Sequence, residues 1–99
     1  MPFETPVERN EHFIRHGHEF GVILTESEYE NRADAFMFGP QPWHVLECVR
    51  PQGGFARYSQ VAQEYGTVNS RGFLSTYFIP DPARHGKASN LEYYRQKCR

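Results

Sequence analysis

The sequence predicts an α+β domain in which two N-terminal helices pack on a four-stranded antiparallel β-sheet, followed by a short C-terminal helix or tail. Two observations support this fold class. Apolar residues recur at helical spacing in the first 38 residues, and from residue 43 they follow the two-residue period of strands. Short turns join the strand-like segments, as is typical of antiparallel neighbours. A chain of 99 residues has room for one modest core, so we expect a single domain over residues 1–99.

The first helix is predicted to begin at Pro6. Thr5 can cap its first turn, proline is favoured at the first helical position, and Glu8 completes a capping box. We expect this helix to end near His16, with Gly17 as a left-handed stop.

The second helix begins with another capping box, Thr25 to Glu28. An apolar stripe at helical spacing follows and is predicted to face the core; it consists of Tyr29, Ala33, Phe36 and Met37. The glycine and prolines of residues 39–42 end this helix.

Four segments with strand periodicity come next, at residues 43–50, 55–59, 64–69 and 73–79. Residues 51–54 and 70–72 are turns, and residues 60–63 form a loop. Pro80 and Pro82 stop the last strand. Ser89 or Asn90 can cap a final short helix.

Composition and charge restrict the function classes. The net charge is −1 and the pI is about 6.5, which argues against tight non-specific binding of duplex DNA but not against a local cationic cleft. Two cysteines are too few for a disulfide framework, so we expect Cys48 and Cys98 to be free thiols. The sequence has no signal peptide and no apolar run long enough to span a bilayer, so we expect no membrane association.

Histidines are the first candidates for chemistry. Three of the five, His12, His16 and His18, fall within seven residues around the end of the first predicted helix. Histidine exchanges protons near neutral pH, so this cluster is the expected seat of catalysis. Each ring also has a simpler interpretation, and His18 can be a solvated loop residue.

Arginines and hydroxyl groups of the predicted strands are the second candidates. Arg50 and Arg57 lie on neighbouring strands, and arginine pairs with phosphate through two parallel hydrogen bonds. Ser75, Thr76 and Tyr77 follow one another in the last strand. Ser75 and Thr76 must point to opposite faces, so only one of them can face a given cleft. Arg50 can be an edge-strand charge and Arg57 can face solvent.

Together these residue types suit metal-free RNA cleavage. That reaction needs a base for the 2′-hydroxyl proton, cations for the phosphorane and an acid for the leaving 5′-oxygen. A metal site built on His12, His16 and His18 is the competing interpretation. The zinc-protease motif needs glutamate directly after its first histidine, where this chain has Phe13, and paired cysteines are missing. We therefore expect neither a metal nor another cofactor.

The order of the motifs resembles one family of bacterial toxin nuclease domains. The motifs are His12-Phe13-x-x-His16-Gly17-x-Glu19-Phe20-Gly21, Glu28-Tyr29 with Ala33 and Phe36, Arg50-x-x-Gly53, Arg57-Tyr58, Glu64-Tyr65-Gly66 and Gly72-x-Leu74-x-Thr76-Tyr77-Phe78-x-Pro80. They resemble the C-terminal ribonuclease domains of contact-dependent inhibition and other polymorphic toxin systems, in the barnase, EndoU, colicin and RelE fold group. The resemblance covers about residues 10–95.

The resemblance implies metal-independent cleavage of RNA, with tRNA as the expected substrate, leaving a 2′,3′-cyclic phosphate. It assigns catalytic roles to His16, Arg57, Thr76 and Tyr77, with His12 as a further member. Arg50, Ser75 and His18 are expected to bind substrate. The expected protein partner is a cognate immunity protein that neutralises the toxin.

The resemblance also implies a delivery route and an oligomeric state. Relatives usually form the last domain of a much longer secreted protein, so we expect a monomeric domain, separated from such a protein or free-standing, that acts in the cytoplasm of a target bacterium. Many relatives carry basic residues where this chain has Ser75 and Ile79. The alternative is therefore a catalytically weak or inactive protein-interaction module with the same fold.

Overall fold

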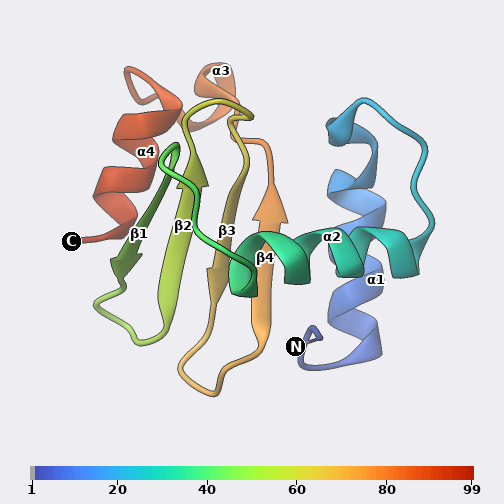
Figure 1. Ribbon diagram of the computed structural model, residues 1–99. Helices are drawn as coiled ribbons and strands as arrows, with labels where there is room; N and C mark the ends of the chain where they lie inside the picture. Colours follow the sequence, from blue (N-terminus) through green and yellow to red (C-terminus); the bar gives the residue numbers. More distant parts are fainter. Residues whose placement is uncertain (1) are drawn as a thin grey trace.

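The computed structural model describes residues 2–99 and has the predicted α+β architecture (Figure 1). Its N-terminal part contains α1 (Pro6–His16), the 3₁₀ turn η1 (Gly17–Phe20) and α2 (Glu26–Phe38). The strands are β1 (Val45–Val49), β2 (Phe55–Ser59), β3 (Tyr65–Val68) and β4 (Leu74–Phe78). The chain ends with α3 (Pro82–His85) and α4 (Asn90–Lys97). Within residues 2–99, no helix is long and apolar enough to cross a membrane.

The strands pair antiparallel in chain order, β1-β2-β3-β4, which confirms the predicted sheet. Each predicted segment contains the observed strand, and the second prediction matches β2 residue for residue. The turn between β1 and β2 requires glycine at position 54. The φ angle of Gly54 is +72°, and a Cβ there would lie 1.8 Å from the carbonyl oxygen of Val68.

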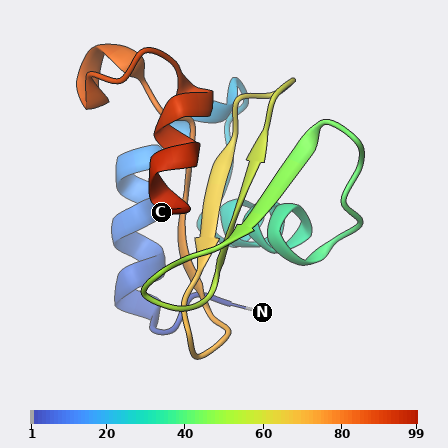
Figure 2. The ribbon, with the colours of Figure 1, turned by 90° about the vertical axis from the view of Figure 1, so that its left-hand side faces the viewer.

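Helices cover both faces of the sheet. Figure 2 shows α2 on one side of the strands and α4 on the other, and α1 packs beside α2 and β4. Successive side chains of a strand point to opposite faces, so β4 directs Tyr77 toward α2 and Phe78 toward α4. The buried core on the α2 side consists of Phe3, Phe20, Tyr29, Ala33, Met37, Val68, Leu74 and Tyr77.

The C-terminal segment is a structural layer rather than a loose tail. Ser89 caps α4, because its side-chain oxygen accepts a hydrogen bond from the backbone N–H of Glu92 at 3.1 Å. Tyr94 of α4 stacks on Tyr58 of β2, with ring centroids 5.7 Å apart. A second buried cluster thus closes the face of the sheet opposite α2.

The end of α1 differs from the prediction. Thr5 caps the helix as expected, accepting from Glu8 N–H at 3.1 Å. Gly17, however, has φ −58° and continues right-handed into η1, and the left-handed residue is Gly21 with φ +75°. The extra turn buries Phe20, whose ring stacks on Tyr77 at 4.6 Å. Burial of this aromatic ring favours continuing the turn over stopping at Gly17.

The prediction of free thiols is wrong. Cys48 of β1 and Cys98, which follows α4, form a disulfide with their Cα atoms 5.8 Å apart. The two residues are 50 positions apart in the chain, so no local pattern indicates that they meet. The bond joins the end of α4 to the edge strand of the sheet.

Removing this disulfide is expected to destabilise the fold. In a Cys98→Ser variant the unfolded chain regains the entropy of an open loop, and we expect the free energy of unfolding to fall by about 4 kcal/mol. Urea denaturation under non-reducing conditions measures the change. The Cys48→Ser/Cys98→Ser double variant is the control and should lose the same amount, because both variants lack the same bond. An unchanged urea midpoint in the single variant would contradict the expected role of the disulfide.

Candidate active site

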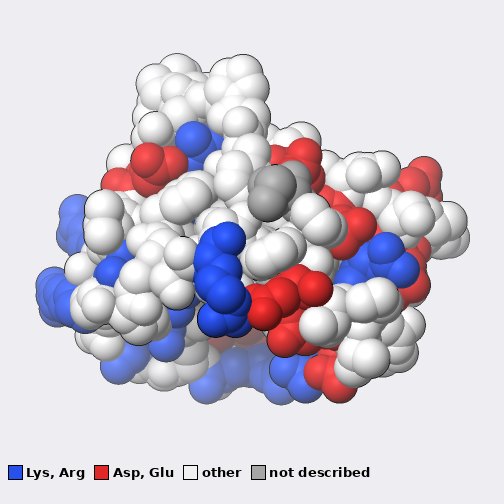
Figure 3. All heavy atoms as spheres, turned by 90° about the horizontal axis from the view of Figure 1, so that it is seen from below, with Lys and Arg blue, Asp and Glu red and all other residues white. Residues whose placement is uncertain are grey.

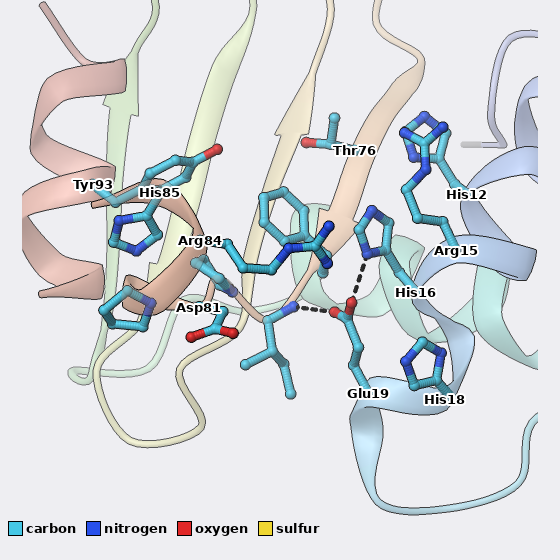
Figure 4. Close-up of a pocket in the computed structure, with 14 residues that line it drawn as sticks. His12, Arg15, His16, His18, Glu19, Thr76, Asp81, Arg84, His85 and Tyr93 are labelled. Carbon is cyan, nitrogen blue, oxygen red and sulfur yellow. Dashed lines mark hydrogen bonds and ion pairs between the residues drawn. The ribbon is translucent and has the colours of Figure 1, made fainter. Parts of the chain in front are cut away.

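A cleft of about 710 Å³ opens on the α4 side of β4 (Figure 4). The end of α1 and η1 form one wall, the β4–α3 segment and α4 form the other, and Thr76 and Phe78 of β4 contribute to the lining between them. The lining residues are His12, Arg15, His16, His18, Glu19, Thr76, Phe78, Ile79, Pro80, Asp81, Pro82, Arg84, His85 and Tyr93. The fold thus brings titratable side chains from both ends of the chain into one concavity.

His16 is held in place by Glu19. Its Nδ1 lies 2.7 Å from Oε2 of Glu19, and the other carboxylate oxygen accepts a hydrogen bond from the backbone N–H of Ile79 at 2.8 Å. An ionised carboxylate can only accept, so Nδ1 of His16 carries a proton, and in the neutral ring Nε2 keeps the lone pair. The arrangement is that of an oriented general base.

Aromatic contacts fix the plane of the same imidazole. His16 stacks on Phe78 with centroids 4.9 Å apart, and on its helical neighbour His12 at 6.2 Å. His12 in turn stacks on Phe3 at 5.3 Å. Burial lowers the pKa of His12, and the positive charges of His16 and Arg15 lower it further. The neutral form of His12 is therefore favoured, while half-buried His16 forms part of the cleft wall.

Two arginines supply positive charge to the cleft. Arg15 lies in the last turn of α1 and lines the cleft. Figure 4 shows Arg84 extending from α3 toward His16. Neither arginine forms an ion pair within residues 2–99. The hydroxyl groups of Thr76 and Tyr93 point toward one another across the cleft (Figure 4). These cations and hydroxyls can bind an anionic group placed beside His16.

His85 has a different role from His16. Its Nδ1 accepts the backbone N–H of Lys87 at 3.0 Å, so the proton is on Nε2, which donates to Oδ1 of Asn90 at 3.0 Å. The ring also stacks on Tyr93 at 4.7 Å. Because both nitrogens are engaged, the ring of His85 is held in place as part of the cleft wall.

Four of the predicted site residues meet in this cleft, namely His12, His16, His18 and Thr76. Ser75 does not line it. The register of β3 and β4 shifts here, since Thr67 pairs with Thr76 and Val68 with Leu74, so Ser75 is the extra residue of a bulge and the simple alternation expected for this pair does not hold. Of the two, only Thr76 lines the cleft.

Arg57 is not at this site, and its predicted convergence with His16 is wrong. The residue is only 9% exposed, and its Nη1 donates to the backbone oxygens of Phe36 at 3.1 Å and Gly39 at 2.8 Å. Its Nε donates to Glu47 at 2.7 Å. Arg57 therefore lies on the α2 face and satisfies carbonyl groups at the C-terminal end of α2.

Tyr77 is also on the α2 face, so its predicted place beside Thr76 is wrong. Its side chain is fully buried, and its hydroxyl donates to Glu64 at 2.6 Å and accepts from Nε of Arg32 at 3.1 Å. Tyr29 donates its hydroxyl to the backbone oxygen of Tyr77. Burial, followed by the hydrogen bond to Glu64, raises the pKa of Tyr77. This ring belongs to the core.

Arg50 lies outside the lining of the cleft but on the same face of the sheet. It continues the alternation of Leu46 and Cys48, which pack in the cluster against α4. Burial raises the pKa of Tyr93, and the positive charge of Arg50 opposes this rise. Arg50 thus acts electrostatically on a residue that lines the cleft.

Several residues of the cleft were not among the predicted site residues, namely Arg15, Glu19, Arg84, His85 and Tyr93. Glu19 could have been found from its spacing, since it is three residues after His16 where the helix ends. Arg84 and His85 belong to the single turn α3, which the sequence analysis did not predict; Asp81 caps it by accepting from Ala83 N–H at 3.0 Å. Within residues 2–99, no group of three or more His, Cys, Asp or Glu side chains is arranged to hold a metal ion.

Comparisons with known proteins bear on the fold. No family model and no curated protein matches the sequence. Among solved structures, the chain is similar to a ribonuclease from Escherichia coli complexed with its inhibitor protein, with a TM-score of 0.62 and 12% sequence identity. The match covers 90% of this chain and 96% of that one. The chain has a ribonuclease-like fold.

A structural role for Arg57 predicts loss of stability without change in the cleft. In Arg57→Ala the carbonyls of Phe36 and Gly39 lose their buried donor, and we expect the free energy of unfolding to fall by about 3 kcal/mol. Urea denaturation measures this loss, and the NMR signals of His16 should stay in place. Arg71→Ala removes an exposed arginine paired with Glu4 and serves as the control, with a much smaller expected change in the urea midpoint because exposed ion pairs are screened by solvent. Shifted His16 signals in folded Arg57→Ala would contradict this role.

The lowered pKa of His12 predicts a loss of stability in acid. Its pKa is near 6.5 in the unfolded chain and lower in the folded one, so below about pH 6.5 the unfolded state takes up a proton that the folded state does not bind. The free energy of unfolding should be highest above this pH and fall as the pH drops through the folded pKa. Urea denaturation from about pH 8 to about pH 5 measures the slope. His12→Gln should have a shallower slope than the wild type; an equal slope would contradict the assignment.

Proposed function

We propose that the protein is a metal-independent endoribonuclease that cleaves RNA by transphosphorylation and leaves a 2′,3′-cyclic phosphate. One observation carries the proposal: Glu19 fixes His16 with its free nitrogen available in a cleft that also holds unpaired arginines. Base, cation and hydroxyl are the groups that this reaction needs, and their convergence is what distinguishes the site from a mere scaffold.

The proposed first step is proton transfer to His16. Nε2 takes the proton of the 2′-hydroxyl, and the 2′-oxygen forms a bond to the adjacent phosphorus. Glu19 stabilises the imidazolium that results, as a carboxylate beside a catalytic histidine does. The bond from phosphorus to the 5′-oxygen breaks, and this oxygen takes a proton from the imidazolium form of His18, which is exposed at the open side of the cleft.

The negative charge that develops on the phosphoryl oxygens is assigned to Arg15 and Arg84. Both reach the cleft without a carboxylate partner within residues 2–99, and Thr76 and Tyr93 add hydroxyl donors. Positions 75 and 79 carry Ser and Ile instead of basic residues, and Arg15 of α1 and Arg84 of α3 supply the positive charge of the cleft in their place.

The wider biological role is part of the proposal. We propose a monomeric toxin that cleaves tRNA in the cytoplasm of a target bacterium after delivery from a larger protein, and that a dedicated inhibitor neutralises. The support is the motif order described above, the fold of an E. coli ribonuclease that binds an inhibitor protein, and the disulfide, which is typical of exported proteins.

Loss of the proposed base should abolish cleavage. We expect purified protein to cut tRNA in the presence of EDTA and His16→Ala to be on the order of 10³-fold slower, because general base catalysis contributes that much. Electrophoresis of end-labelled RNA measures the rate, and phosphorus NMR identifies the cyclic phosphate.

His44→Ala is the matched control, because His44 is bonded to Ser59 and lines a different pocket from His16. This variant should keep wild-type activity. Undiminished cleavage by folded His16→Ala would remove His16 from the mechanism. Absence of cleavage by the wild type, together with no growth arrest on expression without an inhibitor, would favour the interaction module.

A further inference from the structure

The basic side chains divide into two groups by their partners. The chain has eleven Lys and Arg residues, and five of them form ion pairs with carboxylates within residues 2–99: Arg9, Arg32, Arg57, Arg71 and Arg99. Six have no ion pair in this part of the chain: Arg15, Arg50, Arg84, Lys87, Arg95 and Lys97. Unpaired cations are the ones free to bind phosphate.

Five of the six unpaired cations line the cleft or belong to the C-terminal segment of residues 81–99. Arg15 and Arg84 line the cleft, and the segment contains Arg84 and three more. This segment, here called the basic side, carries five basic and two acidic residues although the whole chain has a net charge of −1. Seen from below, most Lys and Arg side chains lie along the left and lower edges of the molecule, while the centre and right carry acidic side chains together with a few basic ones (Figure 3). The near-neutral total therefore conceals a basic side.

This basic side is continuous with the cleft. Tyr93 lines the cleft, and Nζ of Lys97, one helical turn later, lies 5.1 Å from the centroid of its ring. Arg50 is close enough to oppose the pKa rise of Tyr93, and its Nε is buried without a hydrogen-bond partner in the described chain. A polymer anion leaving the cleft past Tyr93 would meet these cations next.

We propose that this surface, Arg50 and Lys97 beside Tyr93 together with exposed Arg95 in the last turn of α4, binds the nucleotides of an RNA substrate that flank the cleaved phosphate on the α4 side. The inference rests on the proposed function and specifies its substrate as an RNA long enough to extend from His16 across α4. Phosphates neutralise Arg95 and Lys97, and Tyr93 offers an aromatic edge between these contacts and the reacting group.

The experiment compares binding of a 20-nucleotide RNA and of a tetranucleotide to the His16→Ala protein, which leaves the RNA uncut. Fluorescence anisotropy gives Kd for the His16→Ala protein and for three variants of it that also carry Lys97→Glu, Arg95→Glu or the control substitution Arg71→Glu. The three substitutions change the charge equally, and Arg71 lies in the β3–β4 turn. Circular dichroism checks that each variant is folded.

We expect Lys97→Glu and Arg95→Glu each to raise Kd for the 20-mer on the order of tenfold. In a plot of log Kd against log salt concentration, the slope should decrease by about 0.7 for each lost phosphate contact. Arg71→Glu should change Kd for the 20-mer by less than about twofold. Each of the three substitutions should also change Kd for the tetranucleotide by less than about twofold.

Three results would overturn the inference: no detectable binding of the 20-mer, equal weakening by Arg71→Glu, or equally effective displacement of the 20-mer by polyglutamate of matched charge. The last result would indicate a surface for acidic proteins instead. Cleavage of tRNA by protein with His16 intact tests the proposed function separately. Its absence refutes ribonuclease activity, whereas the binding comparison still decides whether RNA occupies this surface.

Discussion

The carboxylate of Glu19 joins the helical part of the molecule to the last strand. One oxygen binds His16 at the end of α1, and the other binds the backbone N–H of Ile79 just beyond β4. The imidazole is therefore oriented relative to the sheet as well as to its own helix, and it does not have to be ordered when a ligand arrives. The buried ring of Phe20 next in the chain, stacked on Tyr77, fixes the turn that carries Glu19. The cleft depends on this connection more than on any other contact.

The parts of the fold that local rules govern could be predicted from the sequence. The caps Thr5 and Thr25 are recognisable because one side chain satisfies a nearby backbone N–H, and both are found in place. The strands follow from their two-residue period, since one face of each is buried against a helix. The period fails only at Ser75, the extra residue of a bulge in β4, which the sequence pattern does not reveal.

Other features depend on which segments meet in space, and the sequence does not encode that locally. Arg57 was expected beside His16 because both residues suit phosphate chemistry, yet its phase in β2 places it on the α2 face with the carbonyls of Phe36 and Gly39. Arg84 and His85 enter the cleft only because the chain turns after β4 and lies opposite α1. The pairing of Cys48 with Cys98 likewise follows from the seating of α4.

The disulfide also has a topological consequence. It closes a covalent ring that contains the end of β1, strands β2 to β4 and both C-terminal helices, because Cys48 and Cys98 are 50 positions apart. An intact ring, even fully unfolded, passes through a narrow pore only as two chain segments side by side, whereas the reduced chain can pass as one. A domain of this design that crosses a membrane in extended form would have to travel as a dithiol, or enter through a channel wide enough for a doubled chain.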